Sequence, residues 1–424
     1  MKVLNLTVSV VKNVVFEKED FYKVLRKTFD SKEISKDEKK TITAFSGCIL
    51  RHYMCFNDLL NRNYKDINDD LKIVIMFMLA NVAFLRRINM EQWVSLLNTY
   101  IKDNALDIDN EKLILFIKEK ENNATLIDES IDKTSHYYCS LRFNLPIFLT
   151  RMWSRTFSKK MTYKIAKGIA KSPKQLIKLN TLKMSVEDFE KKFSNEFIKT
   201  SYQGLYEYIG HEPLKRLPLY QNKKIFSISI GLNELVDELD IDPIKSYALF
   251  SGFYNPLFLA LNVTSKNNIK IENLVEPKKD YHLFKNELKQ FGFVNNSVIE
   301  TTASSMIASL SKKVDTFIVY PTNSSFEKLR LTPDYFLRFD TNGLDELIAN
   351  QKEILNEAKD FVNDGGTLVY VVNTISKKES VLVINEFLEN NKQFVLEKER
   401  QYLPFEDEES ILYYAILRKK NLND

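Results

Sequence analysis

The chain has 424 residues, of which 44% are hydrophobic and 28% are charged, and its formal net charge is +4. These proportions are typical of a folded globular protein and exclude a disordered one, and the length suggests two or three domains. No apolar run approaches the roughly 18 residues that a membrane-spanning helix needs, so contact with a membrane is not expected.

The three cysteines, Cys48, Cys55 and Cys139, all lie in the first third of the chain. Their odd number and irregular spacing indicate reduced thiols and predict no metal site. The first twenty residues predict an amphipathic helix without a cleavage site for a signal peptide, so we expect a cytoplasmic location. No cysteine follows Cys139, which excludes thiol chemistry from the rest of the chain.

Residues 1–135 have the pattern of an all-helical domain. The segments 39–61 and 69–102 carry apolar residues three and four positions apart, and no proline interrupts them. Short polar stretches separate these segments. We therefore predict a helical bundle over residues 1–135.

Residues 140–217 predict a small basic domain with helices and strands. Pro146 breaks the helical pattern, and a basic helix is expected from Thr150 to Lys171. The short apolar segment 176–182 predicts a strand, and Ser185 followed by acidic residues predicts the start of a further helix.

A window between Asp132 and Glu187 contains no acidic residue, although acids and bases nearly balance elsewhere. Aromatic residues such as Trp153 and Tyr163 are interleaved with its cations. Such a block repels itself unless a polyanion neutralises it, which favours contact with nucleic-acid phosphates over a merely solvated helix face. The cations predicted to bind RNA are Arg142, Arg151, Arg155, Lys159, Lys160, Lys164, Lys167, Lys171, Lys174 and Lys178.

Residues 218–424 alternate between apolar strand patterns and amphipathic helix patterns, which predicts a doubly wound, largely parallel sheet. A final strand at 410–420 is expected to close one edge of this sheet in the antiparallel direction. The expected strands are 224–230, 246–253, 269–277, 297–303, 316–320, 367–373 and 412–420, and the expected helices are 232–239, 279–292 and 344–363.

The order of these regions resembles bacterial rRNA cytosine-5 methyltransferases of the Sun/Fmu (RsmB-like) type, which have a NusB-like N-terminal domain. Colinear segments carry the resemblance: "ILRHYMCFNDLL", the basic segment with Pro146, Trp153, Lys178 and Asn180, "VEPKKDYHLFKNELKQFG" and "NDGGTLVYVVNTISKKES". The resemblance implies a NusB-like helical domain, a class I methyltransferase domain of the Rossmann type, and small-subunit ribosomal RNA as the partner.

The same resemblance places the family's two catalytic cysteines at positions where this chain has asparagine. One family cysteine adds to the cytosine ring and the other assists release of the product. The matching positions are Asn323, in the loop 322–324, and Asn373, which follows Val372. An asparagine amide is not a nucleophile, so the resemblance implies a catalytically dead member of the family.

The S-adenosylmethionine site implied by the resemblance is also degraded. Tyr254–Asn255 stands where the family has two glycines that let the backbone approach the cofactor. Ala248, Ala303 and Tyr320 stand where acids are expected, and Glu276 is a vestigial ribose-binding carboxylate. No cofactor is therefore expected.

Three functions fit the sequence. The first is a non-catalytic rRNA-binding pseudo-methyltransferase, acting in ribosome assembly or bound to the ribosome. The second is an active S-adenosylmethionine-dependent rRNA methyltransferase with an unconventional site. The third is a NusB-like interaction module for a ribosomal or transcription protein. We adopt the first as the working hypothesis.

Overall fold

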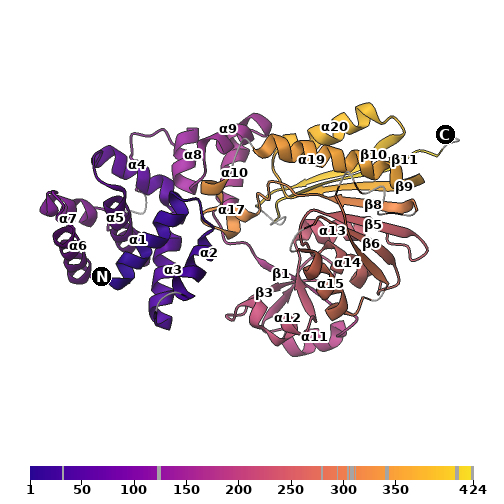
Figure 1. Ribbon diagram of the computed structural model, residues 1–424, viewed down its shortest axis with the longest axis horizontal. Coiled ribbons are helices and arrows are strands. Elements are labelled where there is room, and N and C mark those ends of the chain that lie inside the picture. The colour runs from indigo at the N-terminus through magenta and orange to yellow at the C-terminus, as the bar shows by residue number, and fades with distance from the viewer. Residues whose placement is uncertain are drawn as a thin grey trace. The chain divides into compact units, whose positions relative to one another are not determined.

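The computed structural model describes the chain except for residues 31–32, 122–125, 278–279, 294, 303–304, 306–309, 311, 340–342, 406–409 and 422–424. It divides into two compact units (Figure 1). Unit 1 contains Met1–Lys171 and Lys328–Phe339, and unit 2 contains Ser172–Glu327 and Asp340–Asp424. Residues 140–171 thus lie in unit 1 with the helical bundle. The three predicted domains, 1–135, 140–217 and 218–424, stay a prediction.

Unit 1 is helical, as the sequence predicts, and its first helix is the expected N-terminal one. Serine and asparagine side chains cap several helices; Ser35 and Glu38, for example, form a reciprocal capping box. The helices are α1 (Lys2–Val15), α2 (Phe21–Asp30), α3 (Lys36–Arg51), α4 (Tyr53–Asn63), α5 (Asp69–Ala80), the π-helical turn η1 (Asn81–Leu85), α6 (Met90–Asp103), α7 (Asn110–Lys118), α8 (His136–Phe143), α9 (Ile147–Thr156) and α10 (Lys159–Ile169).

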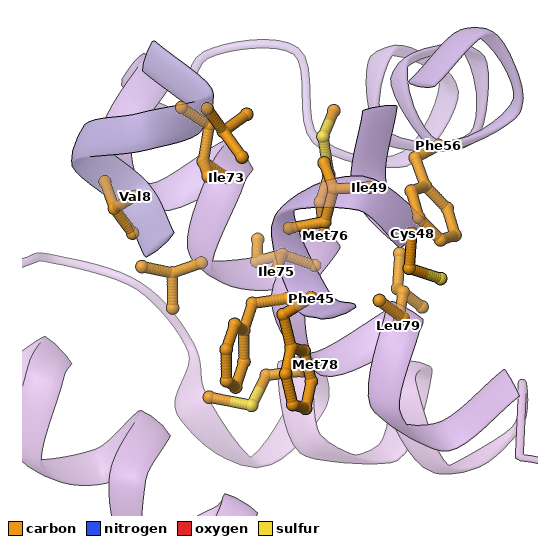
Figure 2. Close-up of a cluster of buried hydrophobic side chains, with 14 of the residues drawn as sticks. Val8, Phe45, Cys48, Ile49, Phe56, Ile73, Ile75, Met76, Met78 and Leu79 are labelled. Atoms are coloured by element: carbon orange, nitrogen blue, oxygen red, sulfur yellow. The ribbon is translucent and has the colours of Figure 1, made fainter. Parts of the chain in front are cut away.

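The core of unit 1 surrounds α5, whose side chains from Ile73 to Ala80 are all buried. Figure 2 shows residues of α5 beside Phe45 and Ile49 of α3 and Val8 of α1. The rings of Phe45 and Phe77 stack with their centroids 3.9 Å apart. A helix that is apolar on all sides is stable only when other helices cover it, so α5 is the central helix of the bundle.

The basic helix predicted from Thr150 to Lys171 is two helices, α9 and α10, and that prediction is corrected. Helix α9 ends at Thr156, and the side chain of Ser158 accepts a hydrogen bond from the Met161 amide to begin α10. Serine favours helix starts over helix interiors, because its hydroxyl competes for backbone amides.

A later segment of the chain completes unit 1. It contributes the short helices α17 (Lys328–Leu331) and α18 (Tyr335–Arg338). Asp334 is fully buried there and accepts hydrogen bonds from the Phe21 amide and the Arg338 guanidinium. Arg338 also pairs with Asp20, at 2.9 Å.

Unit 2 begins with a four-stranded antiparallel sheet in the order β2-β3-β1-β4. Helix α11 (Val186–Phe193) packs on it through Phe189 and begins at Ser185, as predicted. The strands are β1 (Gln175–Leu179), β2 (Phe197–Lys199), β3 (Leu205–Tyr208) and β4 (Ile225–Ser227). The predicted strand 224–230 is therefore not part of the large sheet, because β4 pairs with β1.

The large sheet of unit 2 has seven strands in the order β10-β11-β9-β8-β5-β6-β7. They are β5 (Ser246–Ser251), β6 (Lys270–Val275), β7 (Asn296–Glu300), β8 (Val314–Tyr320), β9 (Val362–Val372), β10 (Phe394–Tyr402) and β11 (Leu412–Lys419). Strand β11 is antiparallel to its neighbours, as predicted, but it is not the edge strand. It lies between β9 and β10, and the sequence did not predict β10.

Helices cover both faces of this sheet (Figure 1). Alternate residues of β5 show why: Tyr247 and Leu249 join one buried cluster, and Ala248 and Phe250 join the other. The first cluster includes α13 (Ile230–Glu238), α14 (Leu257–Thr264) and α15 (Asp280–Phe291), and the second includes α19 (Gly343–Ala358) and α20 (Val381–Asn390). The predicted fold class, a multidomain chain with a helical region and a doubly wound Rossmann-like domain, is confirmed.

Across the described ranges, every helix is too short or too polar to cross a membrane.

Candidate functional site

The candidate site lies where β5, β6, β8 and β9 end, at the carboxyl edge of the parallel strands. The chain runs from β5 outwards through β6 to β7 and then returns to β8 on the other side of β5. Such a switch point is where doubly wound folds bind ligands. The residues predicted from the family resemblance at 254–255, 276, 320, 322–324 and 373 are brought together at this edge.

The loops that follow β5 and β8 are in close contact. The Gly252 amide donates to Tyr320 O at 3.0 Å, and the Thr322 hydroxyl donates to Gly252 O at 3.0 Å. A Cβ atom on Gly252 would lie 2.2 Å from the Thr322 nitrogen. Glycine is therefore required at 252 because the two loops touch there.

Asn323 is buried, and its side chain is used within its own loop. Its amide nitrogen donates to Pro321 O at 2.9 Å, and its Oδ1 accepts from the Ser325 amide at 2.9 Å. These bonds form an Asx-type turn that stabilises the loop. Ser325 has a positive φ of 53°, which this turn supports.

Asn373 binds the neighbouring strand. Its Oδ1 accepts a hydrogen bond from the Tyr320 hydroxyl, and its carbonyl oxygen accepts from the Phe326 amide at 2.9 Å. Burial raises the pKa of Tyr320 well above its usual range, so the phenol stays protonated and remains a donor. Both asparagines at the family's cysteine positions thus hold the loops after β8 and β9 in place.

A buried carboxylate, Glu379, joins these two loops. It is fully buried, and Oε1 accepts from the Ser324 amide at 2.8 Å and from the Gln351 side chain at 3.1 Å. Its Oε2 accepts from the Thr374 hydroxyl at 2.7 Å. Gln351 in turn donates to Thr322 O at 3.1 Å and accepts from Tyr370. No local sequence pattern marks Glu379, because two of its partners, Ser324 and Gln351, lie 55 and 28 positions away in the chain.

Of the predicted cofactor anchors, only Glu276 offers a carboxylate. It follows β6, and its Oε2 lies 3.4 Å from the Thr322 hydroxyl. Ala248 is fully buried within the sheet. Ala303 lies outside the described residues, so its predicted place beside the adenine stays untested.

Tyr254, which stands where the resemblance expects a cofactor-cradling glycine, packs its side chain against α14 and α15. Its ring packs edge-on against Phe258 and Phe284, with centroids 5.8 and 5.5 Å apart. Asn255 is buried and accepts from the Leu257 amide at 3.1 Å. Neither Tyr254 nor Asn255 has a positive φ. The Tyr254 ring is thus part of the core around α14 and α15.

The three cysteines lie in unit 1 and are buried. Burial raises the pKa of Cys48 and Cys55 to about 12 and that of Cys139 to about 11. Buried thiols with raised pKa are poor nucleophiles. Elsewhere in the described chain, no cluster of three or more His, Cys, Asp or Glu side chains could hold a metal ion.

Most of the predicted RNA-binding cations lie on the surface of unit 1. Lys160, Lys164, Lys167 and Lys171 follow one another at helical spacing along and just beyond α10. The cations exposed in unit 1 are Arg142, Arg151, Arg155, Lys159, Lys160, Lys164, Lys167 and Lys171. Among the described carboxylates, none forms a salt bridge with Arg151, Arg155 or Lys167.

The remaining two predicted cations belong to unit 2 and differ from this set. Lys174 is exposed but pairs with Glu207 at 3.0 Å. Lys178 is buried on β1 and donates to Asn233 at 2.6 Å, and desolvation lowers its pKa. The prediction that Lys178 contacts RNA is corrected, because a side chain enclosed in this way does not reach a phosphate.

Comparisons with known proteins agree with this fold. Residues 263–417 match the family described as 16S rRNA methyltransferase RsmB/F. This match, from α14 to β11, makes the region similar to RNA methyltransferases that use S-adenosylmethionine. No curated protein matches the chain.

Solved structures extend the likeness beyond that region. The crystal structure of PH0851 superposes with a TM-score of 0.73 at 15% identity, covering 98% of this chain and 99% of that one. A methyltransferase homolog protein from Pyrococcus horikoshii gives 0.58 at 16% identity, over 69% of this chain and 100% of that one. NSun6 from Pyrococcus horikoshii with SFG gives 0.58 at 13%, over 65% and 98%. At such identities these likenesses show the fold, and the first extends it to the helical region.

Proposed function

We propose that this chain is a non-catalytic RNA-binding protein built on a methyltransferase scaffold. The observation that carries the proposal is the chemistry of the loops after β8 and β9. Unit 2 contains no cysteine, and the two positions expected to hold thiols carry asparagines. Both amides are engaged in hydrogen bonds that hold the loops. Cytosine C5 needs a thiolate added at C6 before it accepts a methyl group, and these loops supply none.

The loss of the cofactor site supports the same proposal. Of the predicted anchors, Glu276 is the single acid, and it lies within reach of the Thr322 hydroxyl. Tyr320, where the resemblance expects an acid, is buried and donates to Asn373. The residues present do not fit S-adenosylmethionine, because a site that lacks hydrogen-bond partners for the ligand's polar groups loses about 1–3 kcal/mol for each.

RNA binding is supported by the cations of α9 and α10. Arg151 and Arg155 lie one turn apart on α9, and the lysines of α10 continue the positive surface. Exposed cations on adjoining helices can each neutralise a phosphate and release a counterion. We propose ribosomal RNA, in the small subunit, as the partner. A NusB-like role for the helical region and a cytoplasmic location belong to the same proposal.

A charge-reversal experiment tests the RNA assignment. The variant changes Arg151, Arg155, Lys159, Lys160 and Lys167 to Glu, and affinity for small-subunit rRNA is measured across a salt series. We expect affinity to fall by well over tenfold. The slope of log affinity against log salt should also shrink by about 3.5 to 4.5, since each of the five lost phosphate contacts removes about 0.7–0.9.

A matched variant controls for total charge. It changes five exposed lysines of unit 2, Lys270, Lys285, Lys289, Lys377 and Lys392, to Glu. Acidic residues are interspersed with these lysines, so its affinity should stay within a few-fold of wild type. Equal loss in both variants would mean that α9 and α10 are only a solvated face, and the RNA assignment would be wrong.

A further inference from the structure

A cavity of about 430 Å³ opens in unit 1 beside the basic helix α10. One side is formed by the turn that leads into α8, including Lys133, and by Cys139 of α8 itself. The other side is formed by the first turns of α10, including Lys159, Lys160 and Tyr163. Its volume falls within the roughly 300–1,000 Å³ that is usual for small-ligand sites.

The walls of this cavity are largely apolar. Cys139 and Thr162 are buried, and the Thr162 hydroxyl already donates to Ser158 O at 2.8 Å. Tyr163 is 40% exposed. Phe143 holds it by an edge-on contact, with centroids 5.0 Å apart. A wall of small side chains, Cys139 and Thr162, beside the accessible ring of Tyr163 suits a ligand that is flat and apolar on its faces.

Cations surround the apolar walls. Lys133, Lys159 and Lys160 line the cavity and are exposed, and no described carboxylate lies within salt-bridge distance of them. The nearest acid along the chain, Asp132, is already bound by the amide and hydroxyl of Thr134. The Asp132 carboxylate also attracts Lys159. Three lysines against this one carboxylate leave the cavity with an excess of positive charge. Ser135 and Ser158 cap their own helices.

We propose that this cavity binds one nucleotide of an RNA strand, with its base stacked on Tyr163 and its phosphate neutralised by Lys133, Lys159 and Lys160. A nucleobase is flat and apolar on its faces, and the attached phosphate is anionic, so the ligand matches both parts of the cavity. Base–aromatic stacking with cationic contacts to the backbone is how proteins hold single-stranded RNA. The inference rests on the proposed RNA-binding function and gives it a defined site.

The test uses the full chain and a short fluorescein-labelled single-stranded RNA in a salt series. Tyr163→Ala should weaken binding by about fivefold to a hundredfold, the usual range for one lost stacking contact, without changing the salt slope. Tyr163→Phe keeps the ring and should bind as wild type does. Lys167→Ala, on the same helix but outside the cavity, should reduce the salt slope by about 0.7.

The outcomes separate this inference from the proposed function. If wild type and Tyr163→Ala bind RNA equally, the cavity assignment is wrong while RNA binding stands. If neither protein binds RNA, titration with adenosine 5′-monophosphate tests whether the cavity binds a nucleotide. If wild type binds the mononucleotide and Tyr163→Ala does not, the cavity is a nucleotide site in a protein that does not bind RNA. No binding of the mononucleotide in that case would overturn the cavity assignment as well.

Discussion

Replacing Glu379 with alanine should destabilise unit 2 selectively. The carboxylate accepts hydrogen bonds from the Ser324 amide, the Gln351 side chain and the Thr374 hydroxyl, and it is fully buried. The Thr374 hydroxyl has an alternative partner in the Ser324 hydroxyl, 3.1 Å away. Two donors are then left without an acceptor. At about 1–3 kcal/mol each, the cost is about 2–6 kcal/mol of unfolding free energy.

Urea unfolding with two probes measures this cost. Both tryptophans, Trp93 and Trp153, lie in unit 1, so tryptophan fluorescence reports on unit 1 and circular dichroism reports on both units. In Glu379→Ala we expect the dichroism transition to move to lower urea by about 1 M or more, given a slope of about 1–3 kcal/mol/M. The fluorescence transition should move little.

Two controls define what the result means. Glu379→Gln keeps the shape and one acceptor oxygen and should cost less than Glu379→Ala. Glu389→Ala removes an exposed acid from the same region and should change stability by no more than about 0.5 kcal/mol. If Glu379→Ala were as stable as Glu389→Ala, the buried network would not hold the loops after β8 and β9, and our account of them would fail.

Three further predictions concern the thiols, the pH dependence of stability and the loss of catalysis. Cys48 and Cys55 should react slowly with a thiol reagent at pH 8 in the folded protein and fully in urea, because burial raises the pKa of both to about 12; fast reaction of the folded chain would contradict this. Burial lowers the pKa of His52 to about 4, so His52 is neutral in the folded state and takes up a proton on unfolding below pH 6.5. The free energy of unfolding of unit 1 should therefore be constant above pH 6.5 and fall by about 2 kcal/mol by pH 5, as measured by tryptophan fluorescence in urea. The variant His52→Phe should lose this pH dependence. An unchanged pH profile in that variant would show that another group is responsible. Asn323→Cys combined with Asn373→Cys should restore no transfer of labelled methyl groups to rRNA, because the cofactor anchors are lost separately; measurable transfer would mean that the cofactor site is intact.

The sequence predicted most of the fold, because apolar residues recur in each region at the spacing of a helix or a strand. The apolar spacing of α3 and α5 indicates helices, and the apolar runs of β5, β8 and β9 indicate buried parallel strands. Strand β10 was missed because charged, exposed residues fill its middle, as expected of an edge strand. The break between α9 and α10 was missed because Ser158 is one polar residue in a basic stretch.

The candidate site was predicted less completely. Resemblance to the methyltransferase family led to Asn323 and Asn373, but their partners could not be inferred from it. Glu379 meets Ser324, 55 positions away in the chain, only after the sheet has formed. Lys178 was counted as a surface cation because lysine is rarely buried, and Asn233, also 55 positions away, is what makes its burial possible. Long-range pairing of this kind leaves no local pattern.

Equilibrium dialysis with radiolabelled S-adenosylmethionine tests the central claim most directly. Full-length protein is dialysed against a range of cofactor concentrations, and an RsmB/F-type methyltransferase serves as the positive control. Our account predicts no saturable binding to this chain at concentrations where the control is saturated, since Glu276 alone remains of the expected anchors. A saturable site with a dissociation constant in the low micromolar range would contradict the account and would favour an active methyltransferase with an unconventional site.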